Sequence, residues 1–368
     1  MSRVNLPEVP PLARLPLLVM GMACLLVGVL AGLARFNLDV PALAQRQLGG
    51  HAALMIAGFF GTVIGLERAV ALRRLWPYLA PLCAGLGGIS ALFLPDSALS
   101  AGLFCFAGLV FFGASAVVYR QMPAVFTATL LVGASCLLLG NVLWFMKFEI
   151  DRIMPFWMGF LVLAIAGERL ELTRFLPPQA FAKALFIVLM AGVLLAMGLI
   201  LFGIPAGAVL FAAGFLALAL WLLRYDIARH TIKQSGLTRF VAVCLVLGYG
   251  WLALGSALGV AGGFDLGHPW RDSALHAVFL GFVFSMVIGH APIIFPAVMR
   301  VKIPYSPLFY LPLAALHLSL FLRVVGNMGE MWTVRQTAAL LNGLSLALFI
   351  LTLLFSVWRG IAARKDAP

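Results

Sequence analysis

The chain contains 368 residues, of which 63% are hydrophobic and 10% charged, and its mean hydropathy is +1.08. Charged residues make up about a quarter of an ordinary soluble domain. The composition therefore excludes a soluble enzyme and a nucleic-acid-binding protein. It predicts an all-α polytopic membrane protein whose partner is the lipid bilayer, with one integral membrane domain over residues 1–368.

Apolar runs along the chain predict about twelve transmembrane helices, since a spanning helix needs about 20 mostly apolar residues. The runs are separated by charged residues or by Pro and Gly. In chain order they cover about residues 15–34, 48–66, 77–94, 99–118, 122–146, 153–173, 182–202, 205–223, 238–261, 272–295, 305–325 and 336–358.

The predicted topology explains the net charge of +12. If the N-terminus is cytoplasmic, 18 of the 25 Lys and Arg residues fall in the inner connections and 7 in the outer ones. Cytoplasmic loops carry such an excess of basic residues. We therefore predict a multi-pass protein of the bacterial inner (cytoplasmic) membrane with both termini in the cytoplasm, and no anionic partner is needed.

The five cysteines all lie inside apolar runs and form no C-x-x-C pair. This pattern predicts buried core residues and argues against a disulfide framework or a thiolate metal site. They are Cys24, Cys83, Cys105, Cys136 and Cys244.

Four of the six histidines lie within predicted spans or at their ends, where ionisable groups are costly and commonly mark a functional site. They are His51, His276, His290 and His317. His51 and His276 begin the second and tenth helices, which both enter from the outer side, so we expect the two imidazoles at a similar depth. Two neutral imidazoles at one depth suit the two axial positions of a haem iron.

Small side chains follow His51 on the same predicted helix face. Met55, Gly58, Thr62 and Gly65 lie within about 40° of His51 on an ideal helix. The low bulk of this stripe leaves room for a flat macrocycle, so we assign Met55 and Gly58 as cofactor-binding residues. The alternative is that they allow close helix packing, as small residues commonly do in membranes.

Two segments resemble known haem proteins. Residues 50–61, G-H-A-A-L-M-I-A-G-F-F-G, resemble the second helix of haem–copper oxidase subunit I and the His-rich opening of the NnrS family. Residues 276–282, H-A-V-F-L-G-F, are similar to the H-A-(aliphatic)-x-x-G segment found late in NnrS chains, which are also similar in size and in their number of spans.

The resemblance implies a haem-copper-oxidase-like bundle that binds haem b, as one haem or two, with copper as a second metal. It implies that His51 and His276 are haem ligands and that the protein acts in nitric oxide or respiratory redox metabolism, with a quinol or a cytochrome as electron donor. The haem propionates are expected toward the outer basic residues, of which Arg46 and Arg271 are nearest in sequence.

The chain also departs from these families. An NnrS-like second helix opens H-x-H-E-M, whereas this one reads H-A-A-L-M and lacks the second His and the Glu. Six histidines, two of them in loops, do not suffice for the ligands of a binuclear oxygen-reducing centre. We expect a haem-dependent redox protein that is not a terminal oxidase.

The roles of the other two histidines stay open. His290 follows His276 by fourteen residues, about 21 Å on an ideal helix, so the two cannot bind one iron. His290 is a candidate ligand of a second haem or metal, a group for proton movement, or a donor to a backbone carbonyl. His317 lies on the next helix and is a candidate partner of His290 in a metal site, together with Met286 or Met299.

Two Glu-Arg steps, at residues 67–68 and 168–169, recur at inner helix ends. They predict a salt-bridged cluster of neighbouring helix ends or, in a functional interpretation, the gates of a proton path. The outer connection over residues 262–272 either caps a site or is an ordinary interfacial loop. Interhelical hydrogen bonds are predicted for two asparagines, Asn141 and Asn342.

Two further classes of function are compatible with this sequence. Twelve spans with both ends inside are also a common plan for a secondary transporter, although no Gly/Pro-interrupted half-helices repeat in the two halves. The other class is an assembly factor that holds haem or copper in passage without redox turnover.

Overall fold

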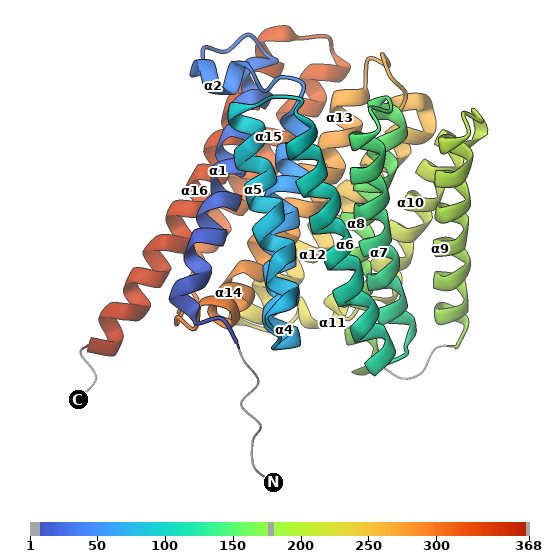
Figure 1. The fold of residues 1–368 in the computed structure, drawn as a ribbon. Helices are drawn as coiled ribbons and strands as arrows, with labels where there is room; N and C mark the ends of the chain where they lie inside the picture. The colour runs from blue at the N-terminus through green and yellow to red at the C-terminus, as the bar shows by residue number, and fades with distance from the viewer. Residues whose placement is uncertain (1–7, 176–179, 366–368) are drawn as a thin grey trace. The chain divides into compact units, whose positions relative to one another are not determined.

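The computed structural model describes residues 8–175 and 180–365 (Figure 1). Every regular element within these residues is a helix. Twelve of the described helices are long and apolar enough to cross a membrane, which confirms the prediction of an all-α polytopic membrane protein. They are Pro11–Ala34 (α1), His51–Leu72 (α3, η1 and α4), Trp76–Phe93 (η2 and α5), Ala98–Gln121 (α6), Val125–Phe145 (α7), Ile150–Leu172 (α8), Ala180–Leu201 (α9), Ala206–Tyr225 (α10), Gly236–Gly263 (α12 and η4), Arg271–Met299 (α13, η5 and α14), Pro307–Met328 (η6 and α15) and Trp332–Ala362 (most of α16).

Several helices are longer than the apolar runs that predict them. The last run covers residues 336–358, whereas α16 extends over Trp332–Lys365, 34 residues or about 51 Å. This length exceeds the roughly 30 Å of a bilayer's hydrocarbon core. Hydropathy detects only the apolar middle of such a helix, because the backbone hydrogen bonds continue into polar residues at both ends.

The chain divides into two compact units. Unit 1 comprises Met1–Ala164 and Ala297–Arg300, and unit 2 comprises Ile165–Pro296 and Val301–Pro368. The boundaries fall inside α8 and inside α14, which covers Ser285–Met299. The single integral membrane domain expected from the sequence stays a prediction.

Glycines allow close helix packing in unit 1. On α1, a Cβ added at Gly28 would lie 2.8 Å from the Met55 sulfur, and one added at Gly21 would lie 3.2 Å from the Thr62 side chain. On the facing helix, a Cβ at Gly58 would lie 3.0 Å from Cys24 Sγ. These positions accept glycine because the two backbones approach too closely for a larger side chain.

A buried arginine organises one end of unit 1. The Arg14 side chain is fully buried and donates hydrogen bonds to Glu8 (2.5 Å), to the Val9 carbonyl (2.9 Å) and to the Val298 carbonyl. Glu8 also binds Arg300, with 2.9 Å between Oε2 and Nη2. These bonds attach the end of α14 to the beginning of α1.

Two spans contain π-helical segments that begin within three residues after a predicted ligand. In unit 1, α3 (His51–Ala53) continues as η1 (Leu54–Phe60) and then α4 (Gly61–Leu72). In unit 2, α13 (Arg271–His276) continues as η5 (Ala277–Phe284). A third segment, η4 (Gly259–Gly263), ends the span of α12. π-Helical turns are rare and are frequently found at functional sites.

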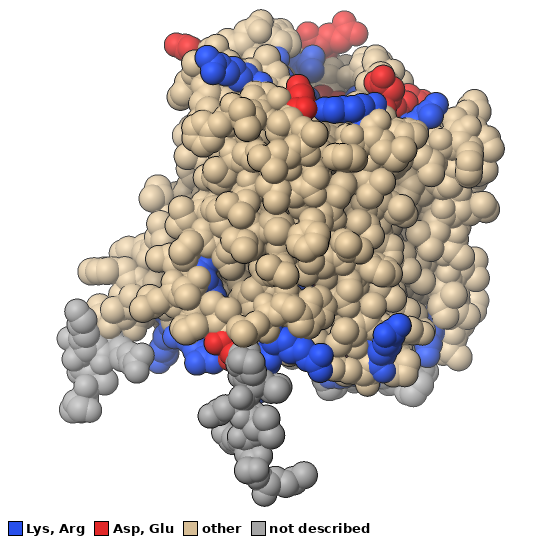
Figure 2. All heavy atoms as spheres, viewed as in Figure 1, with Lys and Arg blue, Asp and Glu red and all other residues tan. Residues whose placement is uncertain are grey.

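Polar side chains in the spans include an asparagine that is bonded between helices. On the face seen in Figure 2, charged side chains gather near the helix ends, and the surface between them is almost wholly uncharged. The Asn141 side chain donates to the Phe104 carbonyl (2.8 Å) and accepts from Trp157 Nε1 (3.0 Å), which confirms its predicted interhelical role. The cysteines have no disulfide, and four of the five are buried as predicted, whereas Cys105 is half-buried.

Candidate functional site

His51 is held against α1 by the backbone. Its Nδ1 lies 2.7 Å from the Gly28 carbonyl oxygen, and a Cβ added at Gly32 would lie 3.0 Å from its Cε1. Because a carbonyl oxygen only accepts, Nδ1 of His51 carries the proton. In the neutral ring the lone pair is then on Nε2, and this form binds a metal through Nε2.

The structure places Met55 and Gly58 against α1, and their assignment as cofactor-binding residues stays a prediction. Both share the face of His51, as predicted, but this face packs on α1, with Met55 against Gly28 and Gly58 against Cys24. The alternative function of small residues, close helix packing, therefore explains the stripe. Periodicity places residues on one face of a helix but does not identify what that face contacts.

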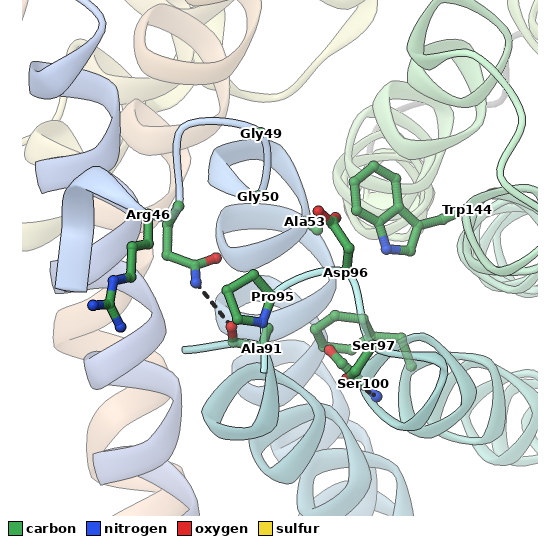
Figure 3. A pocket seen from close by; sticks show the side chains of 12 residues that line it. Arg46, Gly49, Gly50, Ala53, Ala91, Pro95, Asp96, Ser97, Ser100 and Trp144 are labelled. Carbon is green, nitrogen blue, oxygen red and sulfur yellow. Dashed lines mark hydrogen bonds between the residues drawn. The ribbon is translucent and has the colours of Figure 1, made fainter. Parts of the chain in front are cut away.

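A small hollow lies beside the beginning of this helix (Figure 3). Its volume is about 40 Å³, and its lining includes Arg46, Gly50, Asp96 and Trp144. This space admits a few water molecules and is far smaller than the roughly 300–1,000 Å³ of typical ligand pockets. In Figure 3 the Arg46 side chain extends away from Asp96 and Trp144, so the predicted propionate partner does not reach across the hollow.

His276 belongs to a charged cluster in unit 2. Its Nδ1 lies 2.8 Å from the main-chain oxygen of Asp272 and 3.2 Å from the carboxylate Oδ1 of the same residue. Arg323, on α15 (Tyr310–Met328), binds this carboxylate with both Nε (2.9 Å) and Nη2 (2.8 Å). The Arg323 Nη2 also lies 3.3 Å from His276 Nε2.

These contacts define the tautomer of His276 as well. Both neighbours of Nδ1 are acceptors, and the neighbour of Nε2 is a guanidinium, which only donates. Nδ1 therefore carries the proton and Nε2 the lone pair, as in His51. Although the two histidines have the same tautomer, they belong to different units, so their pairing on one iron stays a prediction.

The cluster extends to the last helix through two neutral side chains. Arg323 Nη1 donates to Asn342 Oδ1 (3.2 Å), and Asn342 Nδ2 donates to Ser319 Oγ (2.7 Å). The predicted interhelical role of Asn342 is thus confirmed. Beside it, Ser273 Oγ donates to Asn327 Oδ1 (2.6 Å). Three helices, α13, α15 and α16, are joined by these bonds.

Arg323 is the site residue that sequence reasoning missed. The predicted topology makes it one of the seven outer basic residues and assigns it no role, yet its side chain is 7% exposed and bonds three other polar residues. The signal was an arginine within a predicted apolar run, where a charge needs a partner. Arg271, predicted beside a propionate, donates instead to the Phe264 carbonyl in the 262–272 connection.

His317 has the opposite tautomer from His51 and His276. Its Nδ1 accepts from Trp251 Nε1 at 2.7 Å, so the proton of the neutral ring is on Nε2, which lies 3.4 Å from Ser285 Oγ. A Cβ at Gly281 would overlap Trp251, so this glycine makes room for the indole. With both nitrogens in these bonds, the geometry does not support His317 as a metal ligand.

His290 donates from Nδ1 to the Met286 carbonyl at 2.9 Å, which matches the carbonyl-bonded alternative. The described residues contain no group of three or more His, Cys, Asp or Glu side chains that could hold a metal ion. Within the described residues, a metal site shared by His290 and His317 therefore has no third His, Cys, Asp or Glu ligand.

Arg169 pairs with a residue that is not part of the predicted cluster of Glu-Arg steps. This buried guanidinium binds Asp226, with Nε to Oδ2 at 2.9 Å and Nη2 to Oδ1 at 3.2 Å, and Asp226 also accepts from the Ala228 amide. The partner comes from the end of α10, which a repeated dipeptide cannot indicate. Among the described residues, Arg68 Nε is buried without a hydrogen-bond partner.

A comparison with protein families gives one match. The DUF8744 family, described as a domain of unknown function, matches residues 14–358. No curated protein matches the chain.

Proposed function

The chain belongs to the DUF8744 family. From its own residues we propose that it is a haem-binding integral membrane protein in which His51 and His276 are the axial ligands of one haem b. It acts in nitric oxide or respiratory redox metabolism and takes electrons from a quinol or a cytochrome. The proposal assigns no residue to copper and includes no oxygen-reducing centre, because six histidines are too few for its ligands.

The observation that carries this proposal is the common tautomer of the two histidines. Each Nδ1 donates to a main-chain oxygen, at 2.7 Å in His51 and 2.8 Å in His276, so each Nε2 has its lone pair. Histidine ligands of metals nearly always have such a hydrogen bond from the second ring nitrogen, which fixes the tautomer and the ring orientation. The chemistry of this donor set therefore fits an iron porphyrin.

The residues around the two histidines have separate tasks in the proposal. A bound haem supplies one-electron redox chemistry at its iron. Gly28 and Gly32 hold the His51 ring through a carbonyl and a close backbone surface. Asp272 orients His276, and Arg323 holds Asp272 in place. The 3.3 Å contact from Arg323 to His276 Nε2 is longer than the guanidinium's bonds to Asp272, so it is the contact that an iron held by His276 would replace.

A reduced-minus-oxidised visible spectrum of the purified protein tests this proposal. We expect a low-spin b-type spectrum that His51→Ala and His276→Ala each convert to high-spin or abolish. His230→Ala is the matched control, because His230 is exposed in the short helix α11 (Ala228–Thr231), where it accepts a hydrogen bond from its neighbour Arg229. An intact low-spin spectrum in both ligand variants would contradict the assignment.

We also propose the bacterial inner membrane as the location, with both termini in the cytoplasm. The distribution of Lys and Arg, 18 in inner and 7 in outer connections, supports this orientation. Reporter fusions after residue 368 measure it. A fusion that reports the periplasmic side would overturn the orientation and the predicted outer position of both histidines.

One observation favours a second candidate, proton-coupled transport. Asp272 and Arg323 form an ion pair inside a predicted span, with His276 next to them, and intramembrane ionisable groups commonly mark ion or proton pathways. A purified protein without a haem spectrum that moves protons in proteoliposomes would favour this candidate. Its proton movement should then be lost in Asp272→Asn.

A further inference from the structure

Four residues on four helices of unit 2 form a cluster around a buried ion pair. Arg169 on α8 donates to both carboxylate oxygens of Asp226, which directly follows α10, at 2.9 and 3.2 Å. Tyr249 on α12 and His290 on α14 each interact electrostatically with both members of this pair. We call these four residues the Asp226 cluster, and all of them belong to unit 2. The haem proposed above uses none of them.

The Tyr249 hydroxyl has no hydrogen bond in the described part of the chain. Its side chain is fully buried, and it lies near Asp226 and Arg169 without hydrogen-bonding geometry to either. An unpaired buried polar group costs about 1–3 kcal/mol, and a buried water molecule with a few polar partners removes that cost. The hydroxyl therefore indicates a polar ligand within the cluster, and water is the smallest one.

His290 has a ring nitrogen that is able to accept a proton. Its Nδ1 donates to the Met286 carbonyl at 2.9 Å, so in the neutral ring the lone pair is on Nε2. Protonation at Nε2 keeps the bond to Met286, because both nitrogens of an imidazolium donate. His317 differs, since its Nδ1 accepts from Trp251 and protonation there would break that bond. His290 is thus the histidine that gains a proton without losing its own hydrogen bond.

Two prolines lie between His290 and the end of α14. Pro292 and Pro296 have no amide N–H, so neither bonds the carbonyl four residues earlier. Carbonyl oxygens that lose a helical partner are commonly satisfied by water, also within membranes. His290 itself is half-buried. This end of the helix therefore offers water a row of acceptors that leads toward His290.

We propose that the Asp226 cluster is a proton-binding site in which His290 Nε2 accepts a proton from water and the Asp226 carboxylate stabilises the imidazolium. An O–H bond of a hydronium ion breaks, the N–H bond at Nε2 forms, and a neutral water molecule remains. Arg169 balances the charge of Asp226 beforehand, so the net charge of the cluster rises from zero to +1. The Tyr249 hydroxyl, which both donates and accepts, reorients in response. The site needs neither a haem nor a contact between the two units.

Infrared difference spectroscopy of the full-length protein between about pH 8 and pH 5, where histidine commonly changes charge, tests this site. Isotope labels on histidine and on tyrosine identify the bands of each. We expect a histidine band of proton uptake together with a tyrosine band that reports the changed surroundings of Tyr249. His290→Gln should lose both bands, because it removes the proton acceptor.

Two controls match these changes. His230→Gln removes an exposed histidine of α11, so the tyrosine band should remain. Tyr249→Phe keeps the ring and removes only the unbonded hydroxyl, so it should fold and lose the tyrosine band. Tyr225→Phe is its control and should keep that band, because the Tyr225 ring packs on Trp221 and lies beneath the Arg224 guanidinium.

The outcomes decide the proposal. Loss of the tyrosine band in Tyr249→Phe and in His290→Gln, but in neither control, supports it. Unchanged histidine bands in His290→Gln would overturn it, and so would a tyrosine band that persists in Tyr249→Phe. If His290→Gln does not fold, Tyr249→Phe and its control carry the test. The haem spectrum is a separate measurement, so failure of the haem assignment is recognised independently of failure of the proton site.

Discussion

The chemical groups that contact His51 differ from those that contact His276. Both residues begin a span, both precede a π-helical segment and both donate from Nδ1 to a main-chain oxygen. Around His51 the contacts are glycines and backbone of α1, whereas around His276 they are the charges of Asp272 and Arg323.

This difference predicts different sensitivities to substitution. A site made by backbone approach fails when a side chain is added, because the helices must separate. A site made by buried charges fails when a charge is removed, because the partner left behind is desolvated and unpaired. The two histidines therefore share a tautomer, but the site of His51 is sensitive to added side chains and the site of His276 to removed charges.

The largest expected effect is the loss of one charge beside His276. Arg323→Ala should lower the free energy of unfolding by about 3–5 kcal/mol, since it leaves Asp272 without its bidentate partner. Denaturant or thermal unfolding in detergent measures it. The control is Arg174→Ala, whose pair with Glu171 is 3.4 Å long and exposed, with an expected cost of about 0–1 kcal/mol. Equal costs for the two variants would remove the contrast between the sites.

The next effect concerns the glycines beside His51. Gly28→Val places side-chain atoms where even a Cβ lies 2.8 Å from the Met55 sulfur, so we expect a cost of about 1–3 kcal/mol and displacement of His51 from the Gly28 carbonyl. Gly192→Ala on α9 is the matched control, because a Cβ there meets no atom within 4 Å. A Gly28 variant as stable as the control would show that the approach of these helices is not tight.

A smaller loss is expected for the neutral hydrogen bonds of unit 1. Asn141→Ala leaves the fully buried Trp157 indole N–H without its acceptor and removes the side-chain bond to the Phe104 carbonyl, at a cost of about 1–2 kcal/mol. Ser135→Ala on the same helix removes only a bond to the carbonyl of Leu131, four residues earlier, and should cost less. The two variants, compared by thermal unfolding, test whether interhelical bonds contribute more than local ones.

The smallest effect is expected at His317. His317→Ala removes the acceptor of Trp251 and should cost about 1 kcal/mol, but it should leave a haem spectrum and the bound metal content unchanged. Metal analysis of the purified variant checks this beside His276→Ala. Loss of metal in the His317 variant would mean that its bonds to Trp251 and Ser285 yield to a ligand.

The sequence by itself determined that this is a membrane protein and how many helices are apolar and long enough to span the bilayer. Hydropathy is a local property that each run of about 20 residues carries alone, so no knowledge of neighbouring helices is required. The same reasoning singled out Asn141 and Asn342, since a polar amide in an apolar run needs a partner on another helix. It also placed Met55 and Gly58 on the face of His51.

Only the tertiary structure decided which groups meet. The face of Met55 and Gly58 packs on α1, Arg169 pairs with Asp226 from the end of α10, and Arg323 joins Asp272 across 51 positions of sequence. Such partners depend on how each helix is rotated and at what height it packs, which is set by the fit of whole helix surfaces. The sequence pattern of one helix contains no information about the helix packed beside it. It therefore indicates which polar residues need partners but not which residues those partners are.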